Sequence, residues 1–120
     1  MLKRQYRLKN KKAFDATYKN KRVVSNNLFS LYIGKPKKDI DAPTKFGFVV
    51  SKKFNKRAVK RNRIKRLLRE SVRLAIKENK LGNLDKYMSF VILPKVVEDC
   101  HKIKLVTVQD AFKSTILRIK

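Results

Sequence analysis

The segment 51–70, SKKFNKRAVKRNRIKRLLRE, limits what this chain can fold into more than any other stretch. It holds ten lysines and arginines against one acid, Glu70. Apolar residues recur through and beyond it at helical spacing: Ile64, Leu67, Leu68, Val72, Ala75 and Ile76. At about 100° per residue these side chains share one helix face. The opposite stripe contains Asn62, Arg66, Arg69 and Arg73, with Lys65 at its border. This pattern predicts a folded cationic helix that binds a polyanion.

The whole chain has the same charge bias. It has 120 residues, with Lys+Arg 33 against Asp+Glu 9 and a formal net charge of +24. A hydrophobic fraction of 42% is enough for the core of one domain, 1–120, in which we expect residues 1–9 to form a flexible basic arm. A compact domain with this charge repels itself, and a polyanion relieves the repulsion. Nucleic acid is the first candidate partner, and an anionic membrane surface is the second.

Other classes of protein are disfavoured. A single cysteine, Cys100, allows no internal disulfide and no zinc site with two or four cysteines. No apolar run follows the basic start, so we expect no signal peptide. No stretch approaches the ~20 apolar residues of a membrane span, so we expect a soluble, cytoplasmic chain.

The expected elements are helices separated by strands. Asn10 is a suitable N-cap for a helix over 10–19, and Asn20 is placed to end that helix. Thr107 and Asp110 form a cap-like pair for the last helix. Strands are expected at 23–25, 29–34, 45–51 and 87–93, and further helices at 58–80 and 107–119. The order is α-β-β-β-α-β-α, which indicates an α+β sandwich with helices packed on a small sheet.

Arg61-Asn62-Arg63 lies in the first turns of the long helix, where backbone N–H groups are unpaired. Arginine forks hold phosphates in a bidentate way, so these residues favour contact with a phosphate backbone. A solvated helix face is the simpler alternative. However, like charges at i,i+4 spacing destabilise a helix, and almost no acids are interleaved to offset them.

Aromatic residues suggest a second surface. Phe14 and Tyr18 are four residues apart in the first helix, and Tyr32 points away from the core-type side chains of its strand. If the first helix packs on that sheet face, the three rings form a groove on which single-stranded nucleic acid can stack. The pattern alone favours a core role for Phe14 and Tyr18. Gly47, on the same sheet face, leaves room for a close approach to the backbone.

Catalytic candidates within the chain are weak. Cys100-His101 places a nucleophile beside a base, but adjacent residues rarely form a working pair and no orienting group is evident. Asp39 and Asp41 lie in a loop that could touch a metal, yet the few acids of the chain are spread along it. We interpret all four as ordinary loop residues.

Two stretches, Val50-Ser51-Lys52-Lys53 and the run from Ala58 through Arg61-Asn62-Arg63 to Glu70, closely resemble the signature of the bacterial ribonuclease P protein subunit. The flanking residues Arg7-Leu8, 14–18 and 29–32 are similar to its first helix and following strand. The resemblance implies a ribosomal protein S5 domain 2-like fold, a two-layer sandwich with a mostly antiparallel sheet. It also implies a left-handed βαβ crossover, against the general right-handed rule.

The resemblance further implies a non-catalytic subunit of a ribonucleoprotein that removes the 5′ leader of precursor tRNA. Its partners would be the catalytic RNA and precursor tRNA, with one monomeric protein copy per RNA and no membrane. Mg²⁺ would be bound mainly by the RNA subunit and substrate. The catalytic RNA would contact Lys56, Arg57, Lys60, Arg61, Asn62, Arg63, Lys65, Arg66, Arg69 and Arg73. The leader would lie in a cleft lined by Phe14, Tyr18, Tyr32, Lys52 and Lys53. This implied role replaces the core role that the pattern alone favours for Phe14 and Tyr18.

Two alternatives remain. A generic basic RNA-binding protein of the ribosomal type would share the charge without needing an aromatic cleft. A self-sufficient nuclease would need catalytic groups of its own, which the sequence does not supply in any recognisable arrangement.

Overall fold

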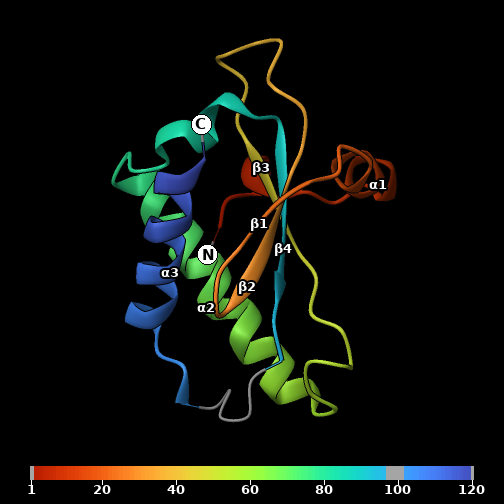
Figure 1. Cartoon of the computed structure of the whole chain (residues 1–120), viewed down its shortest axis with the longest axis vertical. Coiled ribbons are helices and arrows are strands. Elements are labelled where there is room, and N and C mark those ends of the chain that lie inside the picture. The colour runs from red at the N-terminus through yellow and green to blue at the C-terminus, as the bar shows by residue number, and fades with distance from the viewer. Residues whose placement is uncertain (1, 97–101, 120) are drawn as a thin grey trace.

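The computed structural model describes residues 2–96 and 102–119, so Cys100 and His101 lie outside the described residues (Figure 1). Along the chain its elements are the 3₁₀ turn η1 (Arg4–Tyr6), helix α1 (Lys11–Lys19), strands β1 (Arg22–Ser25), β2 (Phe29–Ile33) and β3 (Lys45–Phe48), helix α2 (Ala58–Lys77), the 3₁₀ turn η2 (Gly82–Lys86), strand β4 (Ser89–Pro94) and helix α3 (Leu105–Arg118). The expected α-β-β-β-α-β-α order is confirmed.

The strands form one mixed sheet in the order β1-β2-β4-β3. The pairs β1/β2 and β2/β4 are antiparallel, whereas β3 and β4 are parallel and are connected through α2. The α2 and α3 helices cover one face of the sheet, and α1 lies against the other (Figure 1). The α+β class is therefore confirmed, and the left hand of the crossover stays a prediction.

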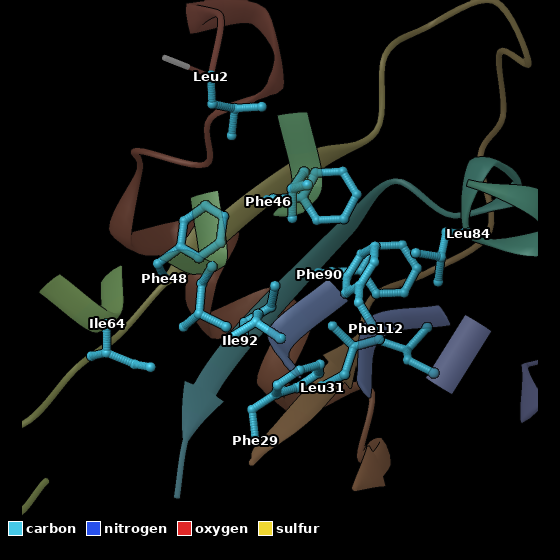
Figure 2. Close-up of a cluster of buried hydrophobic side chains, with 14 of the residues drawn as sticks. Leu2, Phe29, Leu31, Phe46, Phe48, Ile64, Leu84, Phe90, Ile92 and Phe112 are labelled. Carbon is cyan, nitrogen blue, oxygen red and sulfur yellow. The ribbon is translucent and has the colours of Figure 1, made fainter. Parts of the chain in front are cut away.

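The core lies between the sheet and the α2/α3 layer (Figure 2). Alternation along β2 buries Phe29, Leu31 and Ile33 on this face, as expected for a half-covered strand. The β3 and β4 strands add stacked rings, Phe46 and Phe90, whose centroids are 5.5 Å apart. The helices close the core with the stripes expected from the sequence, which are Ile64, Leu68 and Val72 from α2 and Val108, Phe112 and Thr115 from α3.

Helix ends differ from the sequence predictions. The α2 helix ends at Lys77 because Asn79 takes the left-handed conformation, with φ 55°. The α3 helix begins at Leu105 without a side-chain cap, so the predicted Thr107–Asp110 cap pair is wrong and both residues lie inside the helix. Just before this start, the Ile103 carbonyl accepts a hydrogen bond from Arg63, a tertiary contact that no local pattern encodes.

The start of α1 is as predicted, because the Asn10 side chain accepts a hydrogen bond from the Lys12 backbone N–H. The helix also ends at Lys19 as predicted, with Asn20 as its C-cap, but Asn20 is not the left-handed residue. Asn20 keeps a right-handed helical φ of −66°, and Lys21 takes the left-handed conformation instead. The Asn20 amide donates to the carbonyl oxygens of Ile33 and Gly34, both at 3.0 Å. Asn20 therefore ties α1 to the end of β2. With its amide held in this way, the left-handed conformation falls on Lys21, one residue later than predicted.

Residues 2–8 pack against the domain, which differs from the flexible arm expected there. The Leu2 side chain is only 2% exposed and joins the main core cluster. The Leu8 N–H donates to the Phe46 carbonyl at 2.9 Å, and Arg7 forms a parallel bridge with Phe46. In Figure 1 the segment passes from the α2 side of the sheet to α1, next to β3. Isolated leucines in a basic run show no periodicity, so the sequence gives no signal of this packing.

Candidate nucleic-acid interface

The α2 helix presents the first part of the candidate interface. Its apolar stripe is buried against the sheet, so its cationic face lies away from the core. The predicted RNA-binding residues divide by exposure into two groups. The exposed group is Lys56, Arg57, Asn62 and Arg66, and the half-buried group is Lys60, Arg61, Arg63, Lys65, Arg69 and Arg73.

Arg61 and Arg63 make contacts within the protein. The Arg61 Nη1 donates to the carbonyl oxygens of Asn55 and Lys56, both at 2.9 Å, and so closes the turn that precedes α2. The Arg63 Nη2 donates to the Ile103 carbonyl at 2.6 Å, which ties α2 to the segment that leads into α3. Sequence reasoning assigned both arginines to RNA. Their structural contacts were missed because backbone carbonyl partners leave no sequence pattern.

Arg69 and Arg73 also contact the domain. The Arg69 guanidinium carbon lies 5.9 Å from the centroid of the Phe48 ring, a cation–π distance. The Arg73 Nε donates to both carboxylate oxygens of Glu70 at 3.0 Å, and this pairing holds the pKa of Glu70 below its usual value. Four arginines of α2 therefore make contacts within the domain, and the exposed cations among the predicted RNA-binding residues are Lys56, Arg57 and Arg66.

The α1 helix forms the second part of the interface, on the opposite sheet face. The Tyr18 and Tyr32 rings meet edge to face, with centroids 4.9 Å apart. A Cβ atom built on Gly47 would lie 2.4 Å from Phe14 Cε1, so this ring occupies the space that the glycine leaves. Phe14 and Tyr18 are half-buried and lie outside the main core cluster. The pattern-based core reading of these two rings is therefore not supported.

Polar contacts fix α1 at the level of the last residues of β2 and the first residues of β4. The Thr17 and Ser89 hydroxyl oxygens are 2.6 Å apart, and Thr17 is fully covered. Across the sheet, Tyr32 is in register with Val91, and Val91 with Gly47. The next row, Ser30 paired with Leu93, stays half-buried. We define the aromatic cleft as Phe14, Tyr18 and Tyr32 together with this row.

The charge near the aromatic cleft depends on the protonation of Tyr18 and on the positions of Lys52 and Lys53. Burial, followed by the neighbouring Tyr32 and Asp15, raises the pKa of Tyr18 above its usual value, so the phenol is neutral at physiological pH. Lys52 and Lys53 lie exposed in the loop after β3. Within the described residues, no hydrogen bond or cation–π contact joins these lysines to the rings. The structure therefore places the three aromatic residues on one sheet face, with Tyr18 against Tyr32 and Phe14 over Gly47, and the two lysines do not contact them.

The described residues contain no group of three or more His, Cys, Asp and Glu side chains that could hold a metal ion. The Asp39 carboxylate accepts a hydrogen bond from the Asp41 backbone N–H, which is an ordinary loop contact. No helix in residues 2–96 and 102–119 is long and apolar enough to cross a membrane.

Comparison with known proteins decides the family. The ribonuclease P family model matches residues 2–120. The chain belongs to the ribonuclease P protein family. The ribonuclease P protein component of Finegoldia magna is 42% identical over 89 residues, which is 74% of this chain and 70% of that protein. The component of Rickettsia canadensis is 36% identical over 92 residues, or 73% and 76% of the two chains.

Solved structures of the family share the architecture. The ribonuclease P protein of Staphylococcus aureus is 25% identical with a TM-score of 0.70, covering 93% of both chains. The Thermotoga maritima protein superimposes with a TM-score of 0.75 over 95% of this chain and 97% of that one, and at 24% identity it supports the fold alone.

Membership of the family establishes the chain as the protein subunit of ribonuclease P, a ribonucleoprotein endoribonuclease of tRNA processing. It also confirms the expected partnership with an RNA subunit. The two alternatives, a ribosomal-type binding protein and a self-sufficient nuclease, do not account for this match.

Proposed function

We propose that this subunit holds the single-stranded 5′ leader of precursor tRNA in the aromatic cleft while α2 docks on the catalytic RNA. One monomeric protein copy would serve one RNA in the cytoplasm. The observation that carries the proposal is the convergence of Phe14, Tyr18 and Tyr32 on the sheet face that α2 and α3 leave uncovered.

Aromatic rings favour a single strand because its bases expose their faces, whereas bases in a duplex are already stacked. Stacking on aromatic side chains contributes about 1–3 kcal/mol per base and is tolerant of sequence. A leader differs in sequence from one tRNA to another, so a sequence-tolerant surface suits it. The half-buried Ser30–Leu93 row provides a floor beside the rings.

The α2 surface suits a structured RNA. Asn62 and Arg66 project from α2, and Lys56 and Arg57 project from the turn that precedes it. The core holds this helix in place, so the cations lie on a rigid support. Such contacts bind the phosphate backbone without reading sequence. Docking by α2 on one side and leader binding on the other would position the substrate beside the catalytic RNA.

The chemistry would belong to the RNA. The RNA subunit and the substrate would bind Mg²⁺, and the ion would activate the attacking water. The protein's cations would neutralise phosphates that otherwise need divalent ions. We therefore expect the protein to lower the Mg²⁺ concentration that the catalytic RNA needs. An unchanged requirement would contradict this assistance.

The cleft is tested by replacing Phe14 or Tyr32 with alanine in the holoenzyme. Each replacement removes a stacking surface, so binding of precursor tRNA should weaken about 5- to 100-fold, and binding of mature tRNA should not change. Ile40→Ala is a matched control, since this side chain is 75% exposed on a distant loop. Equal losses for precursor and mature tRNA would favour a generic RNA-binding surface.

A further inference from the structure

A second cationic surface lies beside β3, between η1 and α1. Here the chain forms a hollow of about 550 Å³, and its lining residues are Arg4, Gln5, Arg7, Leu8, Lys9, Asn10, Ala13 and Lys45. Four of these residues are cations and none is an acid. A concave surface with charges of one sign concentrates the field on an anion.

The backbone holds this hollow in shape. The Leu8 side chain is buried, and its N–H donates to the Phe46 carbonyl at 2.9 Å. The Arg7 Nε donates to the Leu2 carbonyl at 2.8 Å, which closes the preceding loop. By contrast, Arg4, Lys9 and Lys45 are exposed and make no side-chain hydrogen bond or ion pair with the described residues. Their charges therefore remain available to a ligand.

The hollow begins where the aromatic cleft ends. A Cβ atom on Gly47 would lie 3.2 Å from Leu8 Cδ2 and 2.4 Å from Phe14 Cε1, so Leu8 and Phe14 meet above this glycine. Leu8 lines the hollow, and Phe14 belongs to the aromatic cleft as defined above. A strand that stacks on Phe14 can therefore continue into the hollow without leaving the protein surface.

We propose that the hollow binds backbone phosphates of leader nucleotides that extend beyond the aromatic cleft. The inference rests on the proposed function, because it takes the occupant of the cleft to be the leader. The start of β3 carries Lys45, and the loop after its end carries Lys52 and leads to the α2 surface. Since the catalytic RNA docked on α2 holds the cleavage site, nucleotides near that site enter from the Lys52 side and distal nucleotides reach Lys45.

The test uses a holoenzyme with Arg4→Gln, Lys9→Gln and Lys45→Gln, and precursor tRNAs with leaders of increasing length. With the wild-type protein, affinity should rise as the leader outgrows the cleft. The triple variant should lose about tenfold for the long leader, and its salt slope for that leader should fall by about 2, since each single-strand phosphate contact contributes about 0.7. Affinities for the shortest leader and for mature tRNA should not change.

Two further variants complete the test. Lys86→Gln, Lys102→Gln and Lys113→Gln remove three exposed cations elsewhere and should keep the full length dependence. Lys19→Gln with Lys21→Asn removes cations beside β1, the other way out of the cleft, and asparagine tolerates the positive φ of Lys21. Loss of length dependence in this second variant instead of the triple variant would overturn the proposal.

Other results are equally decisive. A triple variant that binds the catalytic RNA more weakly, whatever the leader, would overturn the assignment to the leader. If the triple variant does not fold, Lys9→Gln and Lys45→Gln should each show part of the loss, and two unchanged single variants would contradict the inference.

A wild-type holoenzyme that does not distinguish precursor from mature tRNA would overturn the proposed function itself. If the wild-type holoenzyme binds precursor tRNA more tightly than mature tRNA but a longer leader adds no affinity, only this inference is overturned.

Discussion

Arg61 and Arg66 are five residues apart on α2 and have different surroundings. Arg61 bonds two carbonyls of its own chain, whereas Arg66 is exposed. We expect Arg61→Lys to lower the free energy of unfolding by about 1.5–3 kcal/mol, because an ammonium does not reproduce the guanidinium contacts. The salt dependence of RNA binding should stay the same, since the charge is kept. Urea unfolding and salt titrations measure the two quantities.

Arg66→Gln is the matched comparison. It should leave unfolding unchanged and reduce the slope of log affinity against log salt by about 0.7–0.9, the value for one phosphate contact. A variant Arg61→Lys of full stability with a reduced slope would show instead that Arg61 contacts phosphate directly.

Single residues were predictable where the signal is local. Asn10 caps α1 as its type and position suggest, and Gly47 marks a close approach, by the Phe14 ring. The partners of Arg61 and Arg63 were not predictable, because they are backbone carbonyls brought close by the fold. Asn20 was assigned to a local turn, but its amide bonds residues more than ten positions away.

At the scale of elements, the segment 2–8 behaves as part of the domain. Leu2 is buried between this segment and α2, beside Tyr6 and Ile76. We expect Leu2→Ala to destabilise the protein by about 2–5 kcal/mol, the usual range for a cavity in a core. Lys3→Ala is the control, because the Lys3 side chain is exposed. Chemical denaturation checks both, and an unaltered Leu2→Ala midpoint would indicate a loosely attached arm.

Elements with strong periodicity were found from the sequence. The α2 stripe and the alternation along β2 fixed the type of each element and the face it buries. Boundaries were less certain, since β3 ends at Phe48 and α2 at Lys77, where tertiary contacts and a left-handed residue intervene. The packing of residues 2–8 could not be predicted from the sequence, because Leu2 and Leu8 do not follow a helical or strand periodicity.

For the whole molecule, charge dominates the expected behaviour. A net charge of +24 on one domain is self-repulsive, so screening should stabilise the free protein. We expect the melting temperature to rise between low and moderate NaCl, with about 4 °C for each kcal/mol gained. Saturating RNA should give a larger rise that added salt reduces. Calorimetry in the absence of RNA measures the first effect, and a melting temperature indifferent to salt would contradict it.

The global arrangement was only partly accessible from the sequence. Element order and the cationic helix follow from pattern, but the face that α1 covers does not. Hydrogen bonds of Thr17 and Asn20, together with the space above Gly47, place α1 opposite α2. The two candidate RNA surfaces therefore lie on opposite faces of the sheet because of contacts between residues far apart in sequence.

The pairing of residues 7 and 8 with Phe46 has a consequence for the subunit before it meets RNA. The β3 strand is the last in the sheet, and an unpaired last strand is a template for intermolecular pairing. At the opposite edge of the sheet, β1 is only four residues long and begins with the cationic Arg22. The Arg7–Phe46 bridge and the Leu8–Phe46 hydrogen bond cover part of the β3 edge. We expect removal of the first eight residues to uncover this edge of β3 and to increase self-association at high salt, which light scattering would measure.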